Sequence, residues 1–226
     1  MTGYRASAAL LAPLILCSTM SCTNKSEPTS HPGGGKSASI SGVHRVSHEF
    51  PSGWAVRTNP QAVVTQQDVD KNRHAAAGLT VRPPQCGARL QRLGDVVGQS
   101  IESITARSGG QTIGVSAAEY PQPYQAPDNA DCSYATFSRP GDVNGTIVPA
   151  PALTIANMTV VGTHIVTDFD DHSGRVVDQY VYLGLVDDRH IVAVSATAGP
   201  AASDLPKIDV AFVQHIFQKA VEAVRA

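Results

Sequence analysis

The chain has 226 residues, of which 42% are hydrophobic and 16% charged, a globular balance that favours one domain or at most two small ones. Its net charge of −2 and the absence of any run of basic residues argue against a nucleic-acid partner. Its one long apolar run, at the N-terminus, is shorter than the about 20 residues that a membrane-spanning helix needs.

Residues 1–21 are predicted to be an export signal. Arg5 is the only charged residue before Lys25, and residues 8–17 form an apolar core of secretory length. Small and polar residues follow this core, as they do at a cleavage point. The pattern therefore indicates a protein that is exported from the cytoplasm.

The signal ends at a cysteine. Cleavage of a bacterial lipoprotein signal leaves a cysteine as the first residue, and lipid is attached to its sulfur. Cys22 fits, because Ser21 is small and polar residues follow, whereas Cys17 still lies in the apolar core. Palmitate-type chains on Cys22 would anchor the protein on the extracytoplasmic face of the cell membrane. Because Thr19 is not the usual aliphatic residue, plain secretion with one spare thiol stays an alternative.

Residues 22–40 are predicted to be a flexible tether. Between 23 and 39 no apolar residue is larger than alanine, so the segment cannot bury enough surface to become ordered. As a flexible chain it would span roughly 20–25 Å. The GGGKS within it resembles part of a phosphate-binding loop, but Ser30 stands where that loop needs a glycine. We therefore expect no nucleotide and no other cofactor.

Two helices are expected next. The first covers residues 65–77, where Thr65 and Asp68 fit a capping box and Gly78 fits a helix end. The second covers residues 84–97, whose apolar residues recur at three- and four-residue spacing. Cys86 lies on that apolar face, so a disulfide from Cys86 to Cys132 would tie this helix to the segment around Cys132.

The cysteines after the tether are Cys86 and Cys132. Two cysteines in an exported chain most simply form one disulfide, and neither has a histidine within ten residues that would suggest a metal site. Closing this loop would stabilise the fold by about 4 kcal/mol at most.

Strands dominate the middle of the chain. Residues 100–108 and 111–119 flank Gly109-Gly110, and residues 176–186 and 190–198 flank a second turn, so both pairs are predicted hairpins. Further strands are expected within 131–138 and within 153–169. An apolar stripe from Ile208 to Val224 then predicts a C-terminal helix, capped by Ser203 or Asp204, that packs on a sheet. We therefore predict one α+β domain over residues 41–226, with five or six antiparallel strands and helices on one face.

Few motifs point to chemistry. His44 and His48 lie four residues apart, but a zinc site needs a third ligand. Asp168, Asp170 and His172 alternate as in a calcium loop, yet the loop's glycine and glutamate positions hold other residues. No nucleophile-elbow motif occurs. We therefore assign no catalytic residue and no metal ligand, although a dispersed Ser-His-Asp site stays open.

Two aromatic features remain. Trp54 is the single tryptophan and is more typical of a core or boundary position than of a ligand platform. The segment 120–127 is rich in proline and tyrosine, which favours an ordered loop over a docking site for a partner.

The segments FPSGWAV (50–56) and VRPPQCGA (81–88) resemble the start of a family of mycobacterial envelope lipoproteins whose C-terminal domain has no assigned function. The resemblance would cover residues 43–226. It implies an envelope location and an α+β fold similar to mycobacterial lipoprotein and sensor domains. It carries over no catalytic residue, because none is established for the family.

Three functional hypotheses follow. The favoured one is a non-enzymatic envelope lipoprotein whose domain binds a hydrophobic or cell-wall ligand, or a partner protein, between sheet and helices. The alternative is an exported hydrolase with a dispersed polar active site. The third is an assembly module without a ligand. A polar His, Asp and Ser cluster would favour the hydrolase, and an apolar site without such a cluster would favour ligand binding.

Overall fold

The computed structural model describes residues 38–90, 93–124, 132–170, 174–199 and 207–226. The described residues all belong to one compact unit, Gly34–Ala226. The predicted signal, Cys22 and the tether up to residue 37 lie outside the described residues. The expected helix caps Ser203 and Asp204 also lie outside them.

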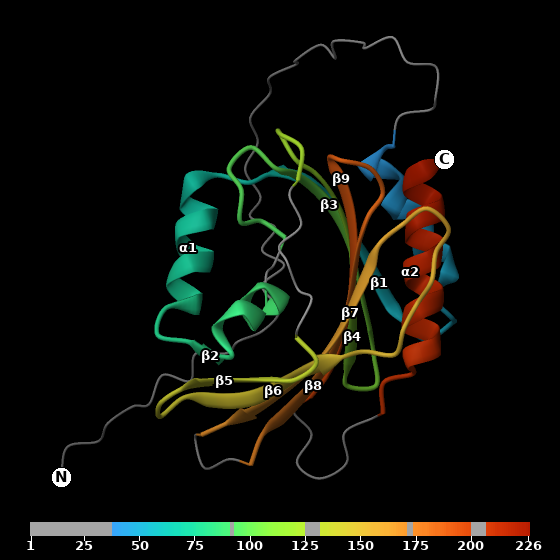
Figure 1. The fold of residues 1–226 in the computed structure, drawn as a ribbon. Helices are drawn as coiled ribbons and strands as arrows, with labels where there is room; N and C mark the ends of the chain where they lie inside the picture. Colours follow the sequence, from blue (N-terminus) through green and yellow to red (C-terminus); the bar gives the residue numbers. More distant parts are fainter. Residues whose placement is uncertain (1–37, 91–92, 125–131, 171–173, 200–206) are drawn as a thin grey trace, which may run out of the picture. The chain divides into compact units, whose positions relative to one another are not determined.

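A single antiparallel sheet organises the domain (Figure 1). Its order is β1-β3-β4-β9-β8-β7-β6-β5-β2, so consecutive strands are mostly neighbours. Among the described residues the strands are β1 Ala55–Val63, β2 Thr80–Arg82, β3 Ser100–Ser108, β4 Gln111–Glu119, β5 Ala135–Arg139, β6 Val143–Pro149, β7 Val160–Phe169, β8 Val176–Leu185 and β9 His190–Ala198. The helical segments are η1 Ile40–Glu49, α1 Gln66–Ala76, η2 Pro84–Leu90 and α2 Val210–Arg225, where η marks a 3₁₀-helix.

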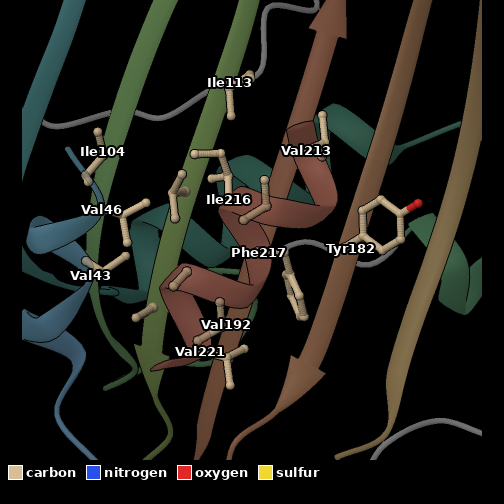
Figure 2. Packing of buried hydrophobic residues seen from close by; sticks show 14 of the residues in the cluster. Val43, Val46, Ile104, Ile113, Tyr182, Val192, Val213, Ile216, Phe217 and Val221 are labelled. Carbon is tan, nitrogen blue, oxygen red and sulfur yellow. The ribbon is translucent and has the colours of Figure 1, made fainter. Parts of the chain in front are cut away.

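The main core lies between one face of the sheet and the pair η1 and α2. Helix α2 buries Val213, Ile216, Phe217, Ala220, Val221 and Val224 in this core. Figure 2 shows these side chains meeting those of the central strands. Ser39 N donates to Val224 O and Ile40 is buried, so the packed structure begins just before residue 41.

Helices α1 and η2 lie on the opposite side of the sheet from α2 (Figure 1). A Cβ on Gly87 of η2 would lie 3.9 Å from Val81 of β2. Arg139 of β5 donates to the carbonyl oxygens of Ala75 and Ala77 at the end of α1. The prediction that the helices pack on one face was therefore wrong, because two helical elements lie on each side of the sheet.

Several local predictions are confirmed. Helix α1 begins after Thr65, whose hydroxyl accepts from Asp68 N while the Asp68 carboxylate accepts from Thr65 N. The two expected hairpins are β3–β4 and β8–β9. The apolar stripe of α2 faces the sheet, but its cap is Asp209, which accepts from Phe212 N. The predicted caps Ser203 and Asp204 were therefore wrong, since the helix starts at Val210.

The predicted strand count of five or six was too small, because β1, β2 and β6 were missed. Strand β1 contains Pro60 and is exposed except at Asn59, so it lacks the alternation that marks a half-buried strand. Strand β6 contains Asn144-Gly145, which is typical of a turn. Strand β2 has only three residues.

The predicted helix over 84–97 was also too long. Its start is the short 3₁₀-helix η2, and a turn follows. Gly94 has φ +96° and Gly98 has φ +84°, in the left-handed region that ends a right-handed helix. The predicted apolar face therefore does not form, and Val97 is exposed. Cys86 is buried and forms the predicted disulfide with Cys132, with the two Cα atoms 5.4 Å apart.

Candidate functional site

The two faces of the central strands β4, β9 and β8 differ in how well they are covered. On the face toward α2, here called the covered face, the side chains of Ile113, Val115, Val192, Val194 and Tyr182 are at most 2% exposed. The alternate residues of the same strands point the other way, and most of them are only half-buried. This second surface is called the open face and consists of Thr105, Thr112, Gly114, Ser116, Val181, Leu183, Ala193, Ser195 and Thr197.

The strand register brings the smallest of these residues together. Ser116 of β4 is opposite Ala193 of β9, and Gly114 is opposite Ser195. Across the next ladder, Ser195 is opposite Val181 and Ala193 is opposite Leu183. Among the described residues, no side-chain hydrogen bond engages the hydroxyl group of Ser116 or Ser195. The open face therefore presents methyl groups and free hydroxyl groups on a rigid sheet, a surface that suits an amphipathic molecule.

One border of the open face lies under η2. Phe137, Ile147 and Ile165 belong to the same side of the sheet and are buried there. The ring of Phe137 lies where a Cβ on Gly145 would stand, so this glycine admits the ring. The Cys86–Cys132 disulfide ties η2 to the segment that leads into β5. This end of the sheet is therefore sealed and gives η2 a fixed position.

Gln99 and Tyr120 form another border, where β3 begins and β4 ends. Both are buried, and the ring centroids of Tyr120 and Tyr124 lie 4.8 Å apart. Burial, with a smaller contribution from Tyr124, raises the pKa of Tyr120 to about 12. Arg189 Nε donates to the Tyr120 carbonyl oxygen, and Tyr124 N donates to the Asp188 carbonyl oxygen. The described start of the Pro- and Tyr-rich segment is thus an ordered loop fixed to the β8–β9 hairpin.

The shortest histidine–carboxylate contact among the described residues lies on the covered face. His164 Nε2 and Asp178 Oδ1 are 2.6 Å apart, and the His164 ring stacks on Tyr180 with centroids 4.2 Å apart. His164 is opposite Tyr180, which has the same orientation as Tyr182. The sheet therefore separates this pair from the serines of the open face. In the part of the chain that the structure describes, no Ser or Thr hydroxyl group is hydrogen-bonded to an imidazole.

A second histidine pair stabilises a turn. His190 Nδ1 lies 2.8 Å from Asp187 Oδ1, and the same oxygen accepts from the backbone N–H groups of Arg189 and His190. Burial raises the pKa of Asp187, but these hydrogen bonds outweigh it and hold the pKa below its usual value. The carboxylate thus organises the β8–β9 hairpin. We therefore assign this pair a structural role.

The predicted metal candidates do not assemble. His44 interacts with Glu102 at 3.3 Å and with the Asn59 carbonyl oxygen, while His48 is exposed. Asp168 and Asp170 lie where β7 ends, and the other candidate in that segment, His172, is outside the described residues. Across 38–90, 93–124, 132–170, 174–199 and 207–226, no group of three His, Cys, Asp or Glu residues is arranged to hold a metal ion.

Trp54 lies at the boundary of the main core, as its residue type suggested. Its ring is 5.6 Å from that of Phe50 and 6.0 Å from that of Phe212, centroid to centroid. Gly53, which precedes it, has φ +96° and makes the turn into β1. The segment FPSGWAV therefore fixes η1 and β1 against α2, and this explains the motif by packing.

The open face and two buried donors, Arg89 and Gln99, were not predicted from the sequence. A signal for the face was present, because large and small residues alternate in Ile113-Gly114-Val115-Ser116 and in Val192-Ala193-Val194-Ser195. Such alternation shows that the faces differ, but it does not show which face another element covers.

In the described residues no helix is both long and apolar enough to cross a membrane.

Comparison with known proteins agrees with the fold. The chain is similar to the crystal structure of an uncharacterised protein of Mycobacterium smegmatis, an ortholog of Rv0999, with 20% sequence identity and a TM-score of 0.69. The similarity covers 84% of this chain and 99% of that one. No curated protein matches the chain. The model of a domain of unknown function, DUF5642, matches residues 39–225. The chain therefore belongs to the DUF5642 family.

Proposed function

We propose that this protein is a non-enzymatic binding protein whose open face receives a hydrophobic or cell-wall ligand. The observation that carries the proposal is the difference between the two faces of β4, β9 and β8. A sheet face that none of the described elements covers fully, in a domain whose other face is closed, is typical of a surface reserved for an occupant. Each methylene group that the occupant buries there contributes about 0.8 kcal/mol.

The residue types on this face support ligand binding over chemistry. Its methyl groups and the hydroxyl groups of Ser116 and Ser195 offer contact area and hydrogen bonds, but no imidazole of a described strand points to this face. A hydroxyl group without an adjacent base is a weak nucleophile. The described residues therefore give the hydrolase alternative no support. A partner protein on the same face is the other occupant that the experiment below can reveal.

A bulky side chain on the open face tests the proposal. We expect Ser195→Trp to lower ligand occupancy at least about tenfold, because an indole would fill the surface that the ligand covers. The measurement is native mass spectrometry of the full chain, carrying Cys22→Ser, after expression in a mycobacterial host. An added mass that dissociates as a lipid or glycolipid supports a ligand, and a co-purified polypeptide indicates a partner protein.

Val63→Trp is the matched control, because Val63 is exposed on the edge strand β1 and, opposite Ser100, points away from the open face. It should leave the occupancy unchanged. Equal occupancy in Ser195→Trp and the unsubstituted chain would exclude the open face as the binding surface. If every sample shows only the mass of the protein itself, the protein retains no ligand and the proposal is contradicted.

We further propose that lipid on Cys22 anchors the domain to the extracytoplasmic face of the cell membrane. Ser21, the polar stretch after Cys22 and the tether length support this proposal. Two or three acyl chains hold a protein stably where one chain is marginal. Cys22→Ser should therefore move most of the protein from the membrane fraction to the soluble fraction, as measured by fractionation and immunoblotting. Wild-type membrane retention of this variant would contradict lipid anchoring.

A further inference from the structure

Two buried side-chain nitrogen atoms of the described residues have no hydrogen-bond partner, Arg89 Nε and Gln99 Nε2. Buried donors are nearly always paired, so each orphan in a native structure needs an explanation. No described residue makes a hydrogen bond with either nitrogen atom. A ligand oxygen would supply an acceptor.

Arg89 differs from the other partly buried arginines. Arg139 pairs with Asp142, Arg189 pairs with Glu119, and Arg225 donates to the Ala156 carbonyl oxygen. Arg175 lies over the Phe169 ring. Arg89 has no ion pair and no hydrogen bond within the described residues, although its Nε is withdrawn from water. A guanidinium group stays charged at any physiological pH, so it cannot relieve this burial by losing its proton.

Arg89 belongs to η2, which lies on the same side of the sheet as the open face. Val81, the neighbour of Gly87 in η2, is opposite Phe137, and Phe137 is opposite Gly145. Gly145 is opposite Thr167 of β7, and Thr167 is opposite Val177 of β8. Val181 lies four residues after Val177, so its side chain points to the same side, and it is opposite Ser195 of the open face. The disulfide at Cys86 holds η2 there. The unpaired guanidinium group therefore lies on the same side of the sheet as the surface that we propose for the ligand.

Gln99 supplies the second donor on this side. Side chains two residues apart in extended backbone point to the same side, so Gln99 has the orientation of Ile101 and Ser103. Ser103 is opposite Ser116 of the open face. Gln99 Oε1 accepts from Gly94 N at 2.8 Å, which fixes the amide group. Nε2 lies close enough to the Tyr120 hydroxyl to lower its pKa slightly, but it makes no hydrogen bond of normal geometry. Both orphan donors therefore lie on the open-face side.

We propose that Arg89 binds an acidic group of the ligand, so that the ligand is an anionic amphiphile with an apolar chain and a carboxylate or phosphate. The inference rests on the proposed function of the open face. A guanidinium group matches both anions because it offers parallel N–H donors, and partial burial strengthens the attraction. The chain of the ligand covers the methyl groups of the open face. Its acidic group replaces the missing partner of Arg89.

The test compares three probes that share one apolar chain, namely dodecanoate, dodecyl phosphate and neutral monododecanoylglycerol. Each is titrated below its micellar concentration into the full chain carrying Cys22→Ser, and dissociation constants are measured by native mass spectrometry. We expect the anionic probes to bind about tenfold more tightly than the neutral one, which corresponds to about 1.4 kcal/mol. The tighter of the two anions identifies the acidic group.

Arg89→Gln should abolish this preference and keep the affinity for the neutral probe. Arg89→Lys should keep part of the preference, and it serves as the second variant if Arg89→Gln does not fold. Arg73→Gln is the matched control, because Arg73 is exposed on α1 beside Asp70, and it should behave as the unsubstituted chain.

The possible failures are distinguishable. If the unsubstituted chain binds all three probes equally, or if Arg89→Gln keeps the anionic preference, the role of Arg89 is refuted while ligand binding by the open face stands. If the unsubstituted chain binds none of the probes and carries no ligand from the host, the proposed function fails, and the anionic ligand with it.

Discussion

Phe217→Ala is expected to lower the free energy of unfolding by about 3–5 kcal/mol. Phe217 is fully buried on α2, and its ring centroid lies 6.1 Å from that of Tyr182. A Cβ on Gly184 of β8 would lie 3.1 Å from the Phe217 ring, so the ring fills the space that this glycine leaves. Figure 2 shows Phe217 projecting from α2 beside Tyr182. Truncation to alanine would leave a cavity that these rigid strands cannot close.

Urea unfolding followed by circular dichroism measures this loss. Gln218→Ala is the matched control, because Gln218 is the next residue of α2 and lies outside the buried stripe. Alanine favours a helix at least as well as glutamine, so the control should change the free energy of unfolding by no more than about 0.5 kcal/mol. Similar losses in both variants would show that Phe217 does not anchor the core.

The sequence predicted those elements whose cause is local. The stripe of α2 repeats with the period of a helix, and Gly109-Gly110 supplies the positive φ values that a tight hairpin needs. The capping box at Thr65 depends only on residues three apart. Each of these patterns determines its structure without reference to distant parts of the chain.

The elements that were missed depend on distant partners. Strand β1 forms because β3 offers it a free edge, and its own residues barely favour a strand. Strand β6 forms between β5 and β7 although its Asn-Gly pair favours a turn. The stretch 84–97 shows the converse, since helical spacing of apolar residues was overridden by the backbone at Gly94 and Gly98.

The candidate site escaped prediction for a related reason. Ser116 and Ser195 lie 79 residues apart in sequence, and only the register of β4 and β9 makes them neighbours across the open face. Arg89 resembles any surface arginine in the sequence. That no described residue pairs with it becomes visible only when the surroundings of η2 are known. The proposed function therefore depends on tertiary structure, whereas the proposed location depends on the first residues of the chain.

Replacing both Cys86 and Cys132 by alanine is expected to lower the free energy of unfolding by up to about 4 kcal/mol, because the bridge closes a loop of 46 residues. Both cysteines are buried beside η2, so the bridge also fixes the element that carries Arg89. The double variant should therefore also weaken binding of dodecanoate or dodecyl phosphate, and should spare the neutral probe more.

Reduction separates the bridge from the packing of the cysteine side chains. A reductant should destabilise the unsubstituted chain in urea unfolding to nearly the level of the double variant, and it should leave the double variant itself unchanged. Equal stability of the chain with and without reductant would mean that the bridge does not stabilise the native fold. If stability falls while the anionic preference survives, η2 keeps its position through contacts such as Gly87 with Val81, and the bridge stabilises the domain without shaping the site.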